Sequence, residues 1–234
     1  MNQRIKDALL QMYRNLNEAE AKQAERGKSD QGERSKVTGG KHMNPIAEAI
    51  RQDLISLGFK KNSVYYEDGC LRLPGWFRPS KDWDLLAFGD NELLAAIELK
   101  SINSSFGNNA NNRSEEALGS AVDIGHAIKN FLIPFTTQPP IIGYVLVVKM
   151  CKKSLKKSGK SKKSIYPTDK VFSHSSYFER LTILCKRLLA ERLYQAVWIV
   201  GVDPENGEIL EPDKDLTYDK FIAALQSRLV IYMA

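Results

Sequence analysis

Apolar residues recur at helical spacing in four segments of this chain. In the first segment, before about residue 24, one face carries Ile5, Leu9, Met12 and Leu16. The second segment begins at Pro45, a favoured first-turn residue, and stops at Gly58. The third is predicted to begin near Ser114, whose hydroxyl can cap a helix, and to bury Ala117, Leu118, Ala121, Val122, Gly125 and Ile128. The fourth predicts an amphipathic helix from about Tyr177 to Leu193.

Short, continuous apolar runs predict the strands. Leu85–Phe88 and Leu94–Lys100 flank a turn around residues 89–92 and predict a hairpin. Two longer runs cover Ile141–Lys149 and Ala196–Val202. The order is therefore helix, hairpin, helix, strand, helix, strand, without an internal repeat. This order predicts an α/β sandwich with a central mixed β-sheet flanked by helices.

Polar segments separate these elements. Residues 1–41 are predicted to form an N-terminal helix followed by a basic arm rich in Gly, Ser, Lys and Arg, and residues 42–234 to form one main domain. Residues 101–112 are predicted to be a loop, because Gly and Asn cluster there. A lysine-rich loop at about 149–175 has two interpretations: an arm that neutralises phosphates, or an exposed, solvated loop.

Composition narrows the class of protein. The chain has 234 residues and a formal net charge of +6, which fits a polyanionic partner without requiring one. The cysteines Cys70, Cys151 and Cys185 lack zinc-site spacing and are interpreted as reduced thiols. The start of the chain lacks an apolar signal segment, and no apolar run approaches the roughly 20 residues that span a bilayer. We therefore expect a soluble, cytoplasmic protein without a membrane partner.

The hairpin carries the candidate chemistry. Asp84 precedes its first strand, and Glu98 and Lys100 end its second. Two carboxylates can hold a hard divalent cation, while a nearby ammonium orients an attacking water. The order Asp, spacer, Glu-x-Lys is the PD-(D/E)xK signature of metal-dependent nucleases.

Strand alternation puts Glu98 and Lys100 on one face, with Leu99 on the other. Asp84 joins that face only if the hairpin has an odd-length loop or a β-bulge. Charged residues at the end of a core strand distinguish this triplet from Glu20-Ala21-Lys22, which lies in a polar, alanine-rich stretch. The alternative interpretation is a surface hairpin bearing an ordinary ion pair.

A proline-stiffened loop at residues 73–81 leads into Asp84. It interleaves two aromatic residues with cations. Trp76 and Phe77 are interpreted as core residues in preference to base contacts, whereas Arg78 and Lys81 are candidate DNA contacts.

Other chemistries lack support. The histidines His42, His126 and His174 have no metal-ligand spacing, and no serine or cysteine lies in a nucleophile elbow. No glycine-rich phosphate loop is present, so no nucleotide cofactor is implied.

Several motifs together resemble the XhoI-type family of type II restriction endonucleases. They are Gly32-Glu33-Arg34-Ser35, Gly39-Gly40-Lys41, Leu73-Pro74-Gly75-Trp76-Phe77-Arg78-Pro79-Ser80-Lys81, Trp83-Asp84, Ala96-Ile97-Glu98-Leu99-Lys100-Ser101, Ser105-Phe106-Gly107-Asn108-Asn109 and Asn111-Asn112-Arg113-Ser114-Glu115-Glu116-Ala117-Leu118-Gly119. One departure is His42-Met43-Asn44-Pro45, where the family has Asn-Met-Asp-Gly.

The resemblance implies a restriction-endonuclease-like fold and a homodimer that cuts both strands of a palindromic DNA site, associated in the family with CTCGAG. In the mechanism that we expect, in-line attack on phosphorus expels the 3′ oxygen and leaves 5′-phosphate ends. It implies Mg²⁺ bound by Asp84 and Glu98, catalysis by these two residues with Lys100, and Glu116 as a further candidate ligand or base. The candidate DNA contacts are Arg34, Lys41, Arg78, Lys81, Asn111, Asn112 and Arg113.

Three alternatives remain. The chain could be a repair or junction-resolving nuclease of the same fold, or a DNA-binding module of this fold without catalysis. A small-molecule α/β enzyme is disfavoured, because neither a nucleotide loop nor a triad is present.

Overall fold

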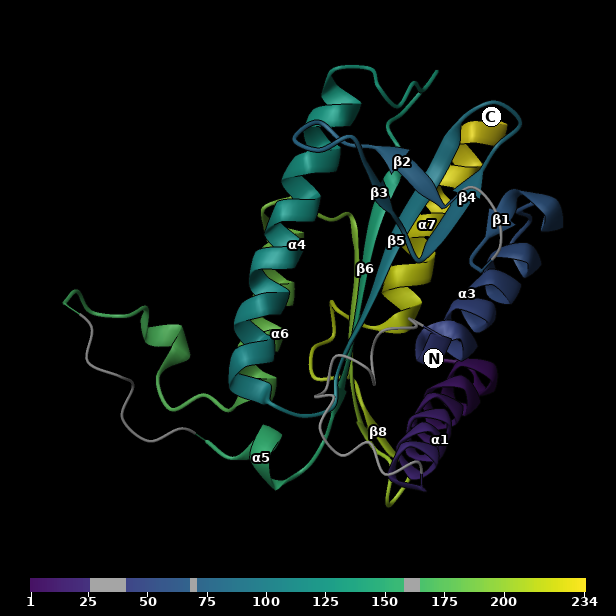
Figure 1. Ribbon diagram of the computed structural model, residues 1–234. Helices are drawn as coiled ribbons and strands as arrows, with labels where there is room; N and C mark the ends of the chain where they lie inside the picture. Colours follow the sequence, from purple (N-terminus) through teal and green to yellow (C-terminus); the bar gives the residue numbers. More distant parts are fainter. Residues whose placement is uncertain (26–40, 68–70, 158–164) are drawn as a thin grey trace.

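A six-stranded mixed β-sheet forms the centre of the molecule (Figure 1). The structure is a computed structural model that describes residues 1–25, 41–67, 71–157 and 165–234. Strand order in the sheet is β1-β4-β5-β6-β7-β8, with β5, β6 and β7 parallel and the other neighbours antiparallel. The strand bounds are β1 Val64–Tyr65, β4 Leu85–Phe88, β5 Leu93–Ile102, β6 Ile141–Lys149, β7 Ala196–Asp203 and β8 Glu208–Leu210. A separate two-stranded sheet pairs β2 (Arg72–Pro74) with β3 (Ser80–Asp82).

Helices cover both faces of the sheet (Figure 1). One face packs against α1 (Gln3–Glu25), α3 (Asn44–Ser56) and α7 (Tyr218–Met233). The other packs against α4 (Phe106–Lys129) and α6 (Tyr177–Ala190). The short helices are α5 Lys152–Leu155, η1 Lys41–Met43, η2 Lys61–Ser63 and η3 Lys170–Phe172. The predicted α/β sandwich with a mixed sheet is confirmed.

Burial on both faces explains the continuous apolar strands. Helices cover both sides of β6 and β7, so residues that point in either direction are apolar. The helix predicted from Pro45 is also confirmed, and Gly58 takes a φ of +110° just after it. At α6, the Ser176 side chain accepts from the Glu179 backbone N–H while the Glu179 carboxylate accepts from the Ser176 N–H, which fixes the start of the helix.

The predicted loop at 101–112 is wrong. Strand β5 continues to Ile102, and α4 begins at Phe106, so Ser114 lies inside the helix and its hydroxyl bonds back to the Ala110 carbonyl. Phe106 is buried and stacks on Tyr177, with ring centroids 6.3 Å apart. This tertiary packing overrides the low helix propensity of the Gly and Asn residues.

The buried stripe of α4 also differs from the prediction. Leu118 and Val122 are exposed, whereas the helix buries Phe106, Ala117, Ser120, Ala121, Asp123, Ile124 and Ala127. Small side chains allow this face of the helix to approach the sheet closely. The buried face of α4 also includes an acidic residue, Asp123.

Elements near the C-terminus were not predicted. Helix α7 packs Phe221 and Leu225 into the same core as α3, and β8 adds the last strand of the sheet. No helix in the described ranges is long and apolar enough to cross a membrane. Cys151 and Cys185 are free thiols, while Cys70 lies outside the described residues.

A buried ion pair ties α7 to the hairpin. Arg228 and Glu92 are 2% and 5% exposed, and Arg228 Nη2 donates to Glu92 Oε1 at 2.7 Å. The other Glu92 oxygen accepts from the backbone N–H and the hydroxyl of Thr136. Burial acts to raise the pKa of Glu92, but its bonds to Arg228 and Thr136 outweigh burial and lower it.

Arg228→Met is expected to lower the free energy of unfolding by about 3–5 kcal/mol at pH 7, because it leaves a buried carboxylate without its cation. The wild-type pair stabilises the fold above the unfolded-state pKa of Glu92, about 4.3, and this stabilisation is lost as pH falls through the folded-state pKa. The difference between wild type and variant should therefore shrink in acid. Urea denaturation at pH 7 and pH 4 measures it.

The double variant Glu92→Gln, Arg228→Met should lose less stability than Arg228→Met alone, because no buried charge remains unpaired. Asp90→Asn, which removes one partner of the exposed Lys60–Asp90 pair, is the surface control and should change nothing measurable. A deficit of equal size at both pH values would contradict this account of the Glu92–Arg228 pair.

Candidate active site

The register of β4 with β5 places two carboxylates side by side. Leu85 pairs with Ile97, so the next position along the ladder sets Asp84 beside Glu98. The register shifts between Ala87 and Phe88, which is the β-bulge required by parity. As a result Asp84, Glu98 and Lys100 share the sheet face covered by α4, and Leu99 packs on the opposite face.

Asp84 is partly buried at the start of β4, and its Oδ2 accepts from the Leu99 backbone N–H at 2.7 Å. Burial and the neighbouring Glu98 charge raise the pKa of Asp84, although Lys100 and the Leu99 hydrogen bond oppose the rise. Asp84 forms no salt bridge within the ranges that the structure describes. Its ionised form is therefore less stabilised by neighbouring cations than that of Glu98.

Glu98 lies between two ammonium groups. Lys81 Nζ on β3 donates to Glu98 Oε2 at 2.5 Å, and Lys100 Nζ forms an ion pair with Oε1. Burial acts to raise the pKa of Glu98, but Lys100 and Lys81 outweigh burial and lower it. Burial acts to lower the pKa of Lys100, but Glu98 and Asp84 raise it overall, so Lys100 carries its charge at neutral pH.

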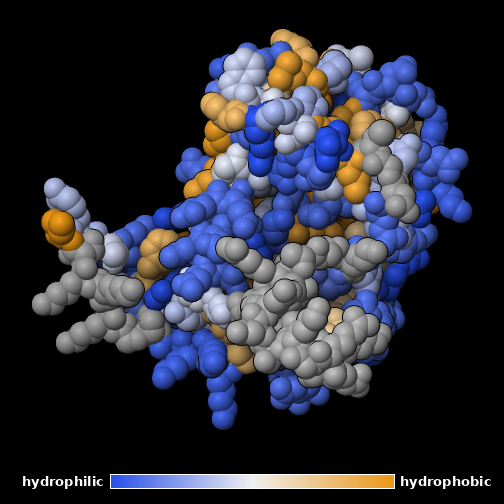
Figure 2. Space-filling model, viewed as in Figure 1, coloured by the Kyte–Doolittle hydropathy of each residue, from blue (hydrophilic) through white to orange (hydrophobic). Residues whose placement is uncertain are grey.

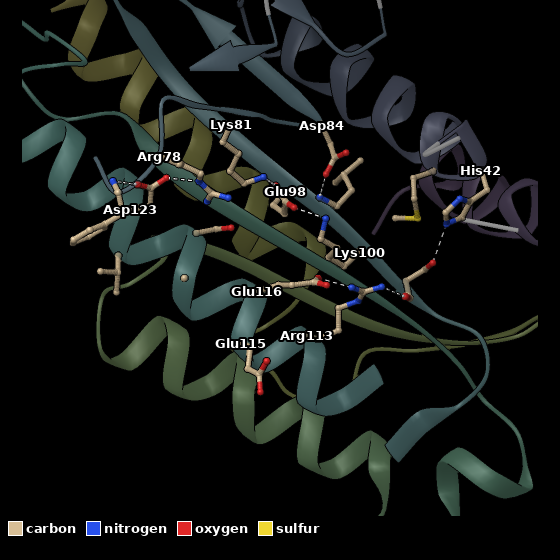
Figure 3. Close-up of a pocket in the computed structure, with 17 residues that line it drawn as sticks. His42, Arg78, Lys81, Asp84, Glu98, Lys100, Arg113, Glu115, Glu116 and Asp123 are labelled. Atoms are coloured by element: carbon tan, nitrogen blue, oxygen red, sulfur yellow. Dashed lines mark hydrogen bonds and ion pairs between the residues drawn. The ribbon is translucent and has the colours of Figure 1, made fainter. Parts of the chain in front are cut away.

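These side chains line a cleft of about 960 Å³ between the end of the sheet and α4 (Figure 3). Lys81 also lies over the Trp83 ring, 4.7 Å from its centroid, which helps to fix its ammonium group at the cleft.

The donor set fits a hard divalent cation. Among the residues with described positions, no three or more His, Cys, Asp or Glu side chains group as metal ligands. Two neighbouring carboxylates are nevertheless what Mg²⁺ accepts, because it keeps several waters and takes the remaining oxygens from substrate phosphates. A cation bound by Glu98 would replace one of its two lysine contacts.

The structure divides the candidates on α4. Glu116 lines the cleft and pairs with Arg113, whose Nη2 also donates to the Ser101 carbonyl at 3.4 Å. Glu115 also lines the cleft but points away from Glu98 and Lys100 in Figure 3. The helix was predicted to begin near Ser114, which would put both glutamates in its first turn. It begins at Phe106 instead, so neither glutamate lies in the first turn.

Asn111 and Asn112 are exposed on the early turns of α4 and are not among the residues that line the cleft. Both have helical backbones and so do not lie in the loop predicted at 101–112. Glu48 faces α1 in a separate hollow, so it does not contribute to this cleft.

Arg78 reaches the cleft from the loop between β2 and β3. Its Nε donates to Asp123 Oδ2 at 2.7 Å. Trp76 and Phe77, interpreted as core residues from the sequence, are 45% and 67% exposed, so that interpretation is wrong. The loop folds back on Asp123 and turns both rings outward instead of into the core.

Sequence reasoning missed two residues at this cleft. Asp123 falls at helical spacing from the buried Ser120 and Ala127, and an acid at such a position signals a partner nearby. His42 has a ring nitrogen 2.9 Å from Ser101 Oγ, and its pKa is lowered by burial and then by Arg113 and Lys100. Its only sequence signal was the departure from the family pattern at residues 42–45.

Other predicted contacts are untested by the structure. Arg34 lies outside the described residues, as does the centre of the lysine-rich loop. Lys41 begins η1, but its side chain is not among those described.

A mixed sheet that carries two carboxylates and a lysine in one cleft has the arrangement of PD-(D/E)xK nucleases. The profile of the family described as Restriction endonuclease XhoI matches residues 22–211. The chain therefore belongs to the XhoI family of restriction endonucleases. Enzymes of this kind generally use a divalent metal.

Three curated relatives carry matching names. The type II restriction enzyme BstVI of Geobacillus stearothermophilus is 36% identical over 84% of this chain and 90% of its own length. The type II restriction enzyme XhoI of Xanthomonas vasicola is 35% identical over 79% of this chain and 71% of its own. The type II restriction enzyme AbrI of Azospirillum brasilense is 37% identical over 62% of this chain and 65% of its own length. No solved structure matches significantly.

Asp84→Asn is expected to raise the free energy of unfolding by about 0.5–2 kcal/mol at pH 7. The folded-state pKa of Asp84 is raised, so its ionisation destabilises the fold as pH rises through that pKa. Asparagine keeps an oxygen for the Leu99 N–H and removes the charge. Urea denaturation without divalent metal measures the change.

Asp82→Asn is the matched control, since Asp82 is an exposed neighbour paired with the exposed Arg72. It should leave the unfolding curve where it is. Loss of stability in Asp84→Asn would show that the aspartate is paired more favourably than its surroundings indicate.

Proposed function

We propose that this chain is a type II restriction endonuclease that uses Mg²⁺ to cut both strands of a short palindromic DNA site and leaves 5′-phosphate ends. The observation that carries the proposal is the meeting of Asp84, Glu98 and Lys100 on one sheet face, in a cleft that also contains Arg78. Membership of the XhoI family supports the site-specific activity.

Asp84 and Glu98, with the Leu99 carbonyl, would hold the cation. When bound, Mg²⁺ supplies positive charge against the charge that develops on the scissile phosphate. A cation on Glu98 would replace one of its contacts with Lys81 and Lys100, and the released ammonium group would then be available to the phosphate or to water. The hydrogen bond from the Leu99 N–H holds the Asp84 carboxylate near Glu98. No salt bridge from the described residues would compete with a cation for Asp84.

Lys100 orients the attacking water. Its charge, held by Glu98 and Asp84, favours the hydroxide that forms as the water loses a proton. Attack on phosphorus forms the new P–O bond and breaks the P–O3′ bond. The departing 3′ oxygen takes a proton from solvent water, which leaves a 3′-hydroxyl and a 5′-phosphate. Glu116, within the same cleft and paired with Arg113, is the candidate acceptor for the water's proton or a further ligand.

The remaining cations position the DNA. Arg78 and Lys81 flank the carboxylates, and Arg113 lies on the α4 side of the cleft. Asn111 and Asn112 are exposed on the same helix and have groups that can bond base edges. Arg34 and Lys41 belong to the basic segment before η1 and would add phosphate contacts.

We propose a homodimer as the active form. Two-fold protein symmetry maps onto a two-fold DNA site and delivers one active site to each strand. CTCGAG is the first target to test, because the family is associated with it. The departure at residues 42–45 places His42 beside the cleft, where a change of side chain would alter the target sequence.

Digestion of DNA of known sequence with Mg²⁺, followed by sequencing of the product ends, tests the proposal. Discrete fragments with 5′-phosphates at one palindrome are expected. Nicks confined to branched DNA would indicate a junction-resolving nuclease, and binding without cuts would indicate a module without catalysis.

Asp84→Asn and Lys100→Ala are each expected to reduce cleavage by about 10³-fold or more, because each removes several kcal/mol of transition-state stabilisation. Specific DNA binding and the circular dichroism spectrum should be retained. Single-turnover cleavage with saturating protein measures the chemical step, and gel-shift titration measures binding. Full cleavage by either variant would refute these catalytic roles.

Arg78→Ala is expected to weaken DNA binding and to reduce the slope of log affinity against log salt concentration by about 1, because one phosphate contact is lost. Fluorescence anisotropy across a salt series measures the slope. Arg72→Ala, which removes an exposed arginine from β2, is the matched control and should leave the slope unchanged. Equal slopes for Arg78→Ala and wild type would reject the contact.

A further inference from the structure

The loop between β2 and β3 presents two exposed aromatic rings at the rim of the cleft. Phe77 lines the cleft beside Arg78, and Trp76 precedes it. We propose that these rings stack on bases of the bound duplex, and that Asp123 is the positioning residue that holds their loop. This inference rests on the proposed function, because it requires the cleft to bind DNA.

Asp123 fixes the backbone of the loop. Asp123 is 4% exposed, and its Oδ1 accepts from the backbone N–H groups of Trp76 and Phe77, each at 2.8 Å. The other oxygen accepts from Arg78 Nε at 2.7 Å. Hydrogen bonds to an ionised carboxylate are roughly twice as strong as neutral ones. Three consecutive residues are thus bound to one buried anion on α4.

Gly75 permits this close approach. A Cβ at that position would lie 2.6 Å from the Arg78 carbonyl oxygen and 2.8 Å from Asp123 Oδ2. Such contacts are too short for real side chains, so only glycine allows the loop to close around the carboxylate. The close packing of the loop around Asp123 thus leaves the rings of Trp76 and Phe77 exposed.

His126 on α4 supports both rings. Its imidazole stacks on Trp76 with centroids 6.3 Å apart and meets the Phe77 ring edge-on at 5.3 Å. The rings are thus held from one side while large fractions of their surface face solvent. Figure 2 shows apolar side chains gathered over the part of the molecule where the β2–β3 loop crosses α4 in Figure 1.

The apolar surface continues into a charged cleft. Val122, 42% exposed, lines the cleft with Phe77, alongside the cations Arg78, Lys81 and Lys100. Rings next to phosphate-binding cations are the combination that binds nucleic acid, because the cations contact the backbone and the rings stack on bases. In a duplex, such rings enter beside a base step and unstack it. The cleft also contains carboxylates, and Glu98, Glu116 and Asp123 are paired with Lys or Arg side chains. This charged, polar lining favours DNA, with a divalent cation bound by the carboxylates, over an apolar protein segment as the occupant.

Trp76 provides a direct probe. The other tryptophans, Trp83 and Trp198, are 3% and 0% exposed. The experiment measures acrylamide quenching of tryptophan emission in the full-length protein, with Ca²⁺ in place of Mg²⁺ and with a duplex that the wild type cuts. We expect DNA to shield the quenchable emission, and Trp76→Phe to lack that emission with or without DNA.

Affinity measurements test Phe77 and Asp123. Phe77→Ala should weaken DNA binding about 5- to 100-fold with an unchanged salt slope, since stacking and not charge is lost. Asp123→Asn should weaken binding as well, and combining it with Phe77→Ala should cost less than the product of the two single effects, because Asp123 acts through the ring. Urea denaturation confirms that each variant is folded. Phe131→Ala, which removes a ring that is 70% exposed and does not line the cleft, is the matched control and should bind normally.

The outcomes separate this inference from the proposed function. A wild-type protein that cuts DNA while Trp76 stays equally quenchable, or while Phe77→Ala binds as tightly as wild type, overturns the stacking role alone. Shielding of Trp76 that rises with protein concentration in the absence of DNA also overturns it, and would assign the rings to a contact between two copies of the chain. A wild-type protein that neither binds nor cuts any duplex contradicts the proposed function and this inference together.

Discussion

The alignment of β4 with β5 is the constraint on which the site depends. A strand that slips by one residue sends every side chain to the other face of the sheet. The bulge between Ala87 and Phe88 changes the parity of the hairpin once, and Asp84 then stands beside Glu98 on the face that α4 covers. Without that bulge, the apolar pairing near the turn and the pairing of the two carboxylates could not both be satisfied.

The buried acids of this protein differ in how they are neutralised. Glu92 has Arg228, Asp123 has Arg78 with two backbone N–H groups, and Glu98 has two lysines. Asp84, which is only partly buried, has one backbone hydrogen bond and no salt bridge among the described residues. Burial and the neighbouring Glu98 charge raise its pKa against the opposing effect of Lys100. Unfavourable electrostatics in the described part of the fold therefore concentrate where a cation would relieve them. Functional sites commonly retain such a local cost to stability.

Local pattern was enough to put Glu98 and Lys100 on one sheet face, because strand alternation relates them. For Asp84 the pattern gave only a condition, an odd-length loop or a β-bulge, and the register shift between Ala87 and Phe88 meets that condition. The start of α4 could not be predicted in this way, because Phe106 is buried against Tyr177, a residue far along the chain. The exposure of Trp76 and Phe77 likewise depends on Asp123, which lies more than forty residues away. The local sequence pattern predicts that such rings are in the core, because it contains no information on the distant residue that holds their backbone.

We propose above that Asp84 and Glu98 hold a divalent cation at the scissile phosphate. The most direct test is a crystal structure of the protein with its DNA site and Mn²⁺, which accepts the same oxygen ligands as Mg²⁺ and has an anomalous signal. We expect an anomalous peak that marks a Mn²⁺ ion coordinated by both carboxylates and by a phosphate oxygen, with Lys100 beside it. A peak bound elsewhere, with Asp84 and Glu98 directed away from the DNA backbone, would contradict it.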